Sequence, residues 1–354
     1  MRRGLMGRDE SELPVAVLEA RLTRLRASMQ SGGLDAVLVY TNNVRPSAVT
    51  YLTGFTPYWS DALLLVGKSG APVFATALSK RVSEWIRTTD PVSEILNTPK
   101  PGSALGALLA KDSAIKRVGV LELDTLPGGL YDEITAAAPA VELVDVTAPF
   151  AALRVAADDT ELGLLRKADA IAVGALNQVD GSSITDAGTF AGMIEKHARL
   201  AGAEEIYVTI APDLSSDARF LRISRPTPLA NRFAVRASVA YKGSWVRRTR
   251  TFAKDGPTTT MEEWFAGVVR SLYAGKSIAS QLTDKVKALS RAEMKGWMAE
   301  GCIGSYPLSV IASSRAPAKD TLPDGQYVVL TVELAIDGAP WIGTAPLVVG
   351  KRSL

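Results

Sequence analysis

Apolar residues along the first half of the chain alternate between helical and strand-like spacing. Residues 18–29 carry apolar side chains at helical spacing with arginines on the other face, and Gly32 and Gly33 end this segment. Short apolar runs bounded by glycine or polar residues predict buried strands at 35–40, 62–66, 72–76, 116–123 and 141–145, with a helix at 131–138. This alternation predicts a sheet covered by helices, as in an α/β domain.

The second half begins with two helical patterns, at 159–173 and 186–202, and Asp158 or Asp159 can cap the first of them. The segments that follow predict strands at 205–210, 233–241 and 245–252, helices near 261–273 and 277–300, and strands at 327–334 and 346–349. Helices grouped apart from antiparallel-looking strands are typical of an α+β domain.

Composition narrows the class of protein. The 354 residues suffice for two domains, and 47% hydrophobic with 22% charged residues is ordinary for a globular fold. The net charge of +3, from 40 basic and 37 acidic residues, provides no basic stripe, so we expect no nucleic-acid partner. The chain shows neither an apolar run long enough to span a membrane nor a secretory signal, and it has one cysteine. We therefore expect a cytoplasmic protein without a membrane partner.

Few side chains can bind a transition metal. His197 is the single histidine and Cys302 the single cysteine, so no cluster of histidine and cysteine ligands can form and a structural zinc site is excluded. A metal centre would have to rest almost wholly on carboxylates. His197 lies in a charged, helix-like segment, which favours a solvated position over a catalytic one.

Four motifs occur in an order that resembles one protein family. They are LDAVLV at 34–39 with YLTGF at 51–55, Leu153-Arg154 with ELGLLRKA at 161–168, YKG at 241–243 with TRTF at 249–252, and LPDG at 322–325 with LTVE at 330–333. Together they resemble creatinase, aminopeptidase P and prolidase along nearly the whole chain. The resemblance implies an α/β creatinase-like N-terminal domain at 1–153 and an α+β pita-bread domain at 154–354. It also implies a homodimer, in which the N-terminal domain helps to close the partner's active site.

Metal-dependent members of that family hold two metal ions with two aspartates, one histidine and two glutamates. Counted from the TRTF motif, the two aspartate positions hold Arg236 and Arg247, and Glu333 matches the first glutamate. The histidine position near 301–304 has no histidine, and the last glutamate position, near Thr344, has no acid. Arginine is cationic and has no lone pair to donate, so these residues would repel a metal. We expect no metal and no other cofactor.

The arginines have two interpretations. Arg236 and Arg247 can bind an anionic ligand, because guanidinium groups match carboxylate and phosphate, or they can pair with Glu333 and other acids of the chain. Glu333 is the first candidate for a catalytic acid or base. The histidine that metal-free creatinase uses should lie near 218–220, where this chain has none.

Other candidates are weaker. Asp213 and Asp217 lie in a loop where relatives place an active-site wall, so they are candidate acids or bases, although solvated loop acids are the simpler interpretation. Tyr58, Trp59 and Asp61 follow the YLTGF motif in a loop that borders the substrate in relatives. Cys302 is a candidate thiolate beside arginines, or a small core residue.

Two functions follow. The favoured one is a metal-independent, creatinase-like hydrolase that cleaves a C–N or amide bond of a small anionic substrate, with Arg236 and Arg247 polarising or holding the substrate. The alternative is a non-catalytic pseudoenzyme of the pita-bread peptidase family that binds a small ligand or a protein partner in the same cleft.

Overall fold

A computed structural model describes residues 7–57, 60–181, 184–223, 225–254, 258–316, 320–350 and 352–354. The described chain divides into two compact units. The N-terminal unit comprises the residues up to Arg154 together with the short segment Cys302–Pro307, and the C-terminal unit comprises Val155–Gly301 and Leu308–Leu354. None of the described helices combines the length and apolar character that a bilayer span requires.

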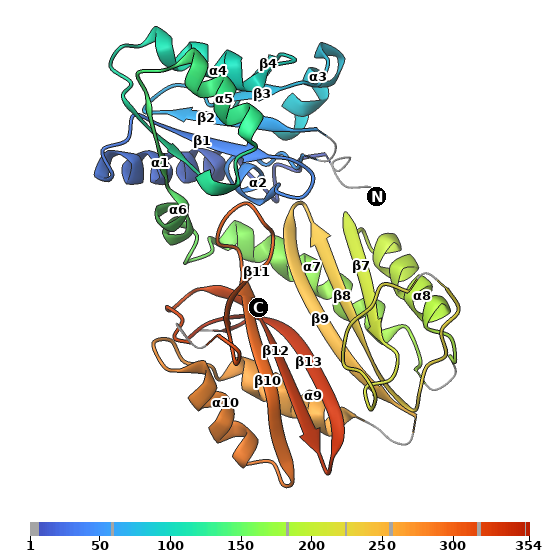
Figure 1. Cartoon of the computed structure of the whole chain (residues 1–354). Helices are drawn as coiled ribbons and strands as arrows, with labels where there is room; N and C mark the ends of the chain where they lie inside the picture. The colour runs from blue at the N-terminus through green and yellow to red at the C-terminus, as the bar shows by residue number, and fades with distance from the viewer. Residues whose placement is uncertain are drawn as a thin grey trace. The chain divides into compact units, whose positions relative to one another are not determined.

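The N-terminal unit is built on a six-stranded mixed sheet with the strand order β4-β3-β2-β1-β5-β6 (Figure 1). The strands are β1 (Ala36–Thr41), β2 (Ala62–Gly67), β3 (Val73–Thr76), β4 (Glu94–Asn97), β5 (Arg117–Val120) and β6 (Glu142–Asp145). The helices are α1 (Val15–Ser31), α2 (Ser47–Thr53), α3 (Lys80–Thr89), α4 (Pro101–Lys111), α5 (Gly128–Ala137) and α6 (Thr147–Leu153), with a 3₁₀ turn at Leu123–Thr125.

Strand β1 shows how this unit buries both faces of its sheet. It pairs antiparallel with β2 and parallel with β5, and all six of its residues are buried. Val37 and Val39 join the core under α1, α2, α3 and α6, whereas Leu38 joins the core under α4 and α5. Because successive side chains of a strand point to opposite faces, a strand covered on both sides reads as one continuous apolar run. The predicted α/β class is confirmed.

The C-terminal unit is built on an antiparallel sheet with the strand order β11-β10-β12-β13-β9-β8-β7, to which β14 adds beside β13. The strands are β7 (Glu205–Ala211), β8 (Arg232–Tyr241), β9 (Ser244–Ala253), β10 (Ala292–Gly301), β11 (Ser309–Ser313), β12 (Tyr327–Ile336), β13 (Ala339–Val348) and β14 (Arg352–Ser353). The helices are α7 (Asp159–Asn177), α8 (Ala187–Leu200), α9 (Thr259–Arg270) and α10 (Ile278–Lys287). The predicted α+β class is confirmed.

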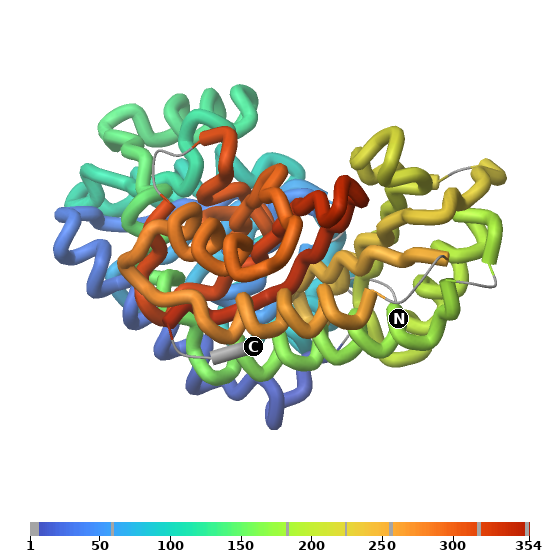
Figure 2. The backbone as a smooth tube through the Cα atoms, turned by 90° about the horizontal axis from the view of Figure 1, so that it is seen from below, coloured from blue at the N-terminus to red at the C-terminus, as the bar shows by residue number. Residues whose placement is uncertain are grey.

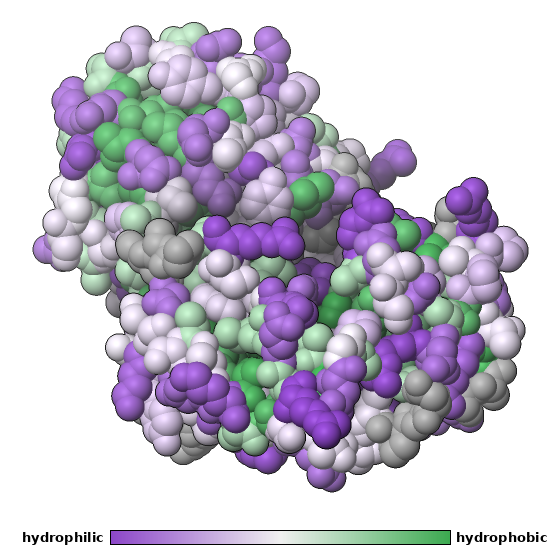
Figure 3. Space-filling view, turned by 60° about the horizontal axis from the view of Figure 1, so that its bottom comes forward, coloured by the Kyte–Doolittle hydropathy of each residue, from purple (hydrophilic) through white to green (hydrophobic). Residues whose placement is uncertain are grey.

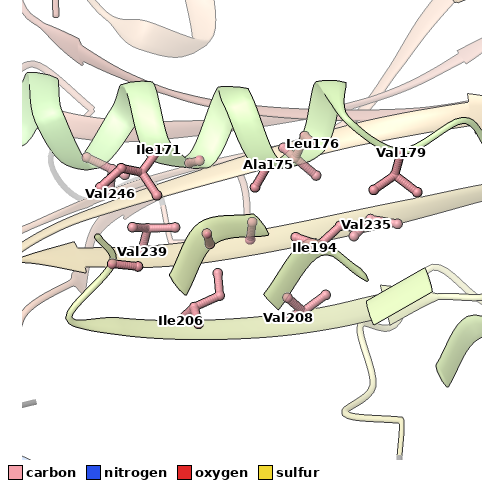
Figure 4. Packing of buried hydrophobic residues seen from close by; sticks show 14 of the residues in the cluster. Ile171, Ala175, Leu176, Val179, Ile194, Ile206, Val208, Val235, Val239 and Val246 are labelled. Carbon is pink, nitrogen blue, oxygen red and sulfur yellow. The ribbon is translucent and has the colours of Figure 1, made fainter. Parts of the chain in front are cut away.

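Helices α7 and α8 pack on one half of this sheet, and α9 and α10 on the other. Figure 4 shows the first contact, in which Ile171 of α7 lies beside Val246 and over Val239 of the strands. Asp158 begins α7 as predicted, because its carboxylate accepts a hydrogen bond from the Glu161 backbone N–H. The opposite face of these strands, which carries Arg236, Thr249 and Thr331, is called the helix-free face below.

The predicted helix at 277–300 is wrong in its second half. The chain is helical only over α10, turns at Arg291 with a positive φ of 57°, and continues as strand β10. The residues of β10 include strong helix formers such as Ala292, Glu293 and Met294. Pairing along the whole length of β12 nevertheless makes this segment a strand, because tertiary context overrides weak intrinsic propensity.

Candidate functional site

Arg236 lies on the helix-free face of β8, where it pairs in register with Thr249 of β9. Its Nε donates a hydrogen bond of 3.3 Å to Thr249 Oγ1, and its guanidinium lies 3.9 Å from the centroid of the Phe220 ring. Among the described residues, no carboxylate forms an ion pair with Arg236. Burial, and secondarily the like charge of Arg247, lowers the pKa of Arg236 to about 10, so the group still carries its charge at neutral pH.

A row of threonines continues from Arg236 across the sheet. Thr249 pairs with Thr344 of β13, and the hydroxyls of Thr344 and Thr331 lie 2.9 Å apart. Thr344 stands near the expected last glutamate ligand, and it is buried. Short hydroxyl side chains here leave the guanidinium of Arg236 as the dominant charge in this row.

Arg247 is neutralised within the protein. Its Nε donates to Ser238 Oγ at 3.0 Å, and its Nη1 lies 2.5 Å from both carboxylate oxygens of Glu300. The side chains of Arg247 and Glu300 are 22% and 7% exposed, so this ion pair is largely shielded from water. We expected Glu333 to satisfy one of the arginines, but the partner of Arg247 is Glu300. The wrong helix assignment at 277–300 concealed that Glu300 lies on a strand of this face.

Glu333 lies half-buried on β12, opposite Gly296 of β10. A side chain at Gly296 would begin 3.3 Å from Glu333 Oε2, so the glycine leaves room for the carboxylate. Within the described chain, no hydrogen bond or ion pair engages Glu333. Its negative charge acts on Arg236 and opposes the fall in the pKa of that guanidinium. The helix-free face therefore presents one available cation and one available carboxylate.

The loop after β7 contributes an aromatic ring, which sequence reasoning missed. Phe220 belongs to a small apolar cluster with Leu214 and Ala234, and this cluster adjoins Arg236. The candidate acids of the loop are engaged locally: Asp213 accepts from the Ser215 backbone N–H.

Asp217 of the same loop forms an ion pair of 2.7 Å with Arg219. Its hydrogen bonds to Arg219 lower the pKa of its carboxyl, so it is ionised at neutral pH. Among the described residues, neither Asp213 nor Asp217 forms a hydrogen bond or ion pair with Arg236 or Glu333.

The remaining candidates belong to the N-terminal unit. Asp61 accepts a hydrogen bond of 2.7 Å from the Tyr40 hydroxyl, and burial together with that carboxylate raises the pKa of Tyr40 to about 12. Tyr58 and Trp59 lie outside the described residues. Cys302 is half-buried; its thiol donates to the Pro307 carbonyl at 2.5 Å and lies 3.9 Å from Ser47 Oγ.

The residues at the metal positions expected from the sequence motifs do not fit a metal ion. By the count from the TRTF motif, Arg236 and Arg247 are expected at the two aspartate positions, and Thr344 near that of the last glutamate. In the part of the chain that the structure describes, no group of three histidine, cysteine, aspartate or glutamate side chains is placed to hold a metal. Glu333 alone cannot supply the several oxygen ligands that a divalent ion requires.

Comparison with known proteins supports the resemblance in the N-terminal part of the chain. Residues 21–156 match the sequence model of the Creatinase/Prolidase N-terminal domain. The chain carries a creatinase/prolidase N-terminal domain. No curated protein matches the sequence significantly.

Solved structures show that the creatinase/prolidase fold extends beyond this domain. Prolidase from Pyrococcus horikoshii OT3 superposes with a TM-score of 0.70 at 15% identity, covering 94% of this chain and 96% of that one. The X-Pro aminopeptidase from Thermotoga maritima MSB8 gives 0.70 at 14% identity, with 94% and 95% covered. The N-terminal domain of the FACT complex subunit SPT16 from chickpea, Cicer arietinum, gives 0.62 at 15% identity, with 94% and 95% covered. These likenesses establish the pita-bread architecture of the C-terminal unit.

The Glu300–Arg247 ion pair predicts a stability effect. Glu300→Gln removes the carboxylate and leaves a shielded guanidinium without its counter-charge, which should lower the free energy of unfolding by about 2–3 kcal/mol in urea titrations. Glu293→Gln is the matched control, because Glu293 lies on the same strand and pairs with Lys295 where both side chains are at least half exposed. That change should cost less than about 0.5 kcal/mol. Equal effects of the two variants would contradict the assignment.

Proposed function

We propose that the helix-free face of the C-terminal unit binds a small anionic ligand and that Arg236 is the group that holds it. The observation that carries this proposal is the charged, largely buried guanidinium of Arg236, whose hydrogen bond to Thr249 uses Nε and leaves both terminal nitrogens available. A carboxylate or phosphate accepts two parallel hydrogen bonds from such a fork. Phe220 covers one side of the guanidinium, which directs a ligand to its edge.

A metal-independent hydrolase of the creatinase type is the function that these groups support best. In hydrolysis of a C–N bond, water adds to the carbonyl carbon, negative charge develops on the carbonyl oxygen, and the departing nitrogen takes a proton. Glu333 is the available carboxylate that can accept the proton of water and deliver one to nitrogen. Arg236 can stabilise the developing oxyanion or orient a substrate carboxylate. Arg247 is already neutralised by Glu300, so we assign it no direct contact with the ligand.

A non-catalytic ligand-binding protein is the second candidate. Its specific support is the sparse set of acids: Glu300 is taken by Arg247, and Asp213 and Asp217 are engaged inside their loop. The same fold occurs in the N-terminal domain of a FACT complex subunit. In this case Arg236 would still bind an anion, but no bond would be cleaved. For both candidate functions we propose that the protein forms a homodimer and lies in the cytoplasm.

The anion site predicts a charge-dependent ligand response. Acetate, succinate and inorganic phosphate are the probes, and at least one should raise the melting temperature of the wild type and bind in calorimetry. Arg236→Ala should weaken that binding about tenfold or more, because charged hydrogen bonds contribute roughly 1.5–3 kcal/mol.

Arg222→Ala is the matched control, since Arg222 is an exposed arginine shortly after Phe220, and it should leave binding unchanged. The anion site is refuted if no probe binds the wild type, or if Arg236→Ala binds as well as the control does.

Turnover separates the two candidate functions. If the protein is a hydrolase, Glu333→Gln should keep anion binding but lower kcat by about 10²-fold or more, since general acid–base groups contribute at least that much. The assay for kcat is the hydrolysis of small N-acyl amino acids in the presence of EDTA, monitored by the amine that is released. Anion binding without any amine release would leave the ligand-binding function and reject the hydrolase.

A further inference from the structure

A cavity lies on the helix side of the C-terminal unit. It has a volume of about 260 Å³ and opens where β9 and β13 meet, with α7 and α9 along its walls. Figure 2 shows these two helices, green and orange, near one another from below. Strands β9 and β13 share one registered pair, Thr249 with Thr344, so the two halves of the sheet separate on either side of it. This separation makes room for the cavity.

The polar wall of the cavity has an excess of positive charge. Arg248 forms a two-pronged ion pair with Asp169, at 2.6 and 2.7 Å, and Arg250 donates to Glu262 at 2.7 Å. Arg270, at the end of α9, is exposed and has no ion pair or hydrogen bond among the described residues. Among the charged side chains at this wall, three arginines face two carboxylates, which leaves an excess of one positive side chain. The unneutralised cation favours an anionic ligand.

The remaining wall is apolar and aromatic. Phe265 and Val269 of α9, Leu176 of α7 and Trp341 of β13 line it. The Phe265 and Trp341 rings meet edge to face with centroids 5.5 Å apart, a favourable geometry for an aromatic pair. A cavity with an apolar body and a cationic rim is complementary to a molecule with an apolar tail and an anionic head.

We propose that this cavity binds a small amphipathic monocarboxylate, with its carboxylate at Arg270 and its alkyl or aryl tail against Phe265, Val269 and Trp341. The volume of about 260 Å³ is close to the lower end of ligand cavities, roughly 300 Å³, which suits a medium-length chain. The site is separate from the anion site of Arg236, because Arg236 lies on the helix-free face and the cavity lies among the helices. Thr249 borders both.

Octanoate is the probe, titrated calorimetrically into the wild type and single variants. Arg270→Gln should weaken octanoate binding about 3–10-fold, as expected for an exposed charged contact. Ala266→Phe, which adds a ring to a residue lining the cavity, should weaken it about tenfold or more by occupying the tail site. Octanol, which has the same tail without the charge, should bind at least about tenfold more weakly than octanoate does.

Two controls separate this site from other effects. Arg87→Gln removes an exposed arginine from the last turn of α3, as Arg270→Gln does from α9, and should leave octanoate binding unchanged. Arg236→Ala should also leave it unchanged. The proposal is overturned if octanoate fails to bind the wild type, or if Arg270→Gln binds as tightly as Arg87→Gln. Loss of binding in Arg236→Ala would also overturn it, by placing octanoate on the helix-free face. Arg270 is exposed, so its variant tests the proposal even if Ala266→Phe does not fold.

Discussion

The need to balance two shielded positive charges shapes the helix-free face of the C-terminal unit. Arg236 and Arg247 project from adjacent antiparallel strands, and burial opposes the charged form of Arg236. Glu300 reaches Arg247 from a third strand and neutralises it. Arg236 has no such partner among the described residues and depends on the more distant charges of Glu300 and Glu333, with an aromatic ring above it. An anionic ligand would complete this charge balance.

The sequence predicts much of this architecture because the relevant signals are local. Continuous apolar runs identify β1 and β2, and a capping aspartate identifies the start of α7. Counting back from the TRTF motif picks out Arg236 and Arg247. The structure puts both on one face, because Arg247 pairs with Ser238 and residues two apart along a strand point the same way. These predictions require only short-range patterns.

The features that the sequence did not reveal are all non-local. Residues 292–300 have helix-forming composition, so Glu300 was not expected on a strand beside Arg247. Phe220 reaches Arg236 from an irregular loop, whose path no periodicity predicts. The segment Cys302–Pro307 packs with the N-terminal unit although it follows β10 in the chain. Figure 3 shows one face of the molecule, with hydrophobic residues gathered in a patch at the upper left and hydrophobic and hydrophilic residues mixed elsewhere.

The central claim is that a guanidinium, and not a metal ion, supplies the positive charge of this face. Titration calorimetry with manganese, cobalt and zinc salts tests it most directly, with Glu333→Gln as the control for the remaining carboxylate. The account predicts no saturable metal binding to the wild type, because two arginines repel the ion and one glutamate cannot hold it. Stoichiometric metal binding that Glu333→Gln abolishes would contradict it.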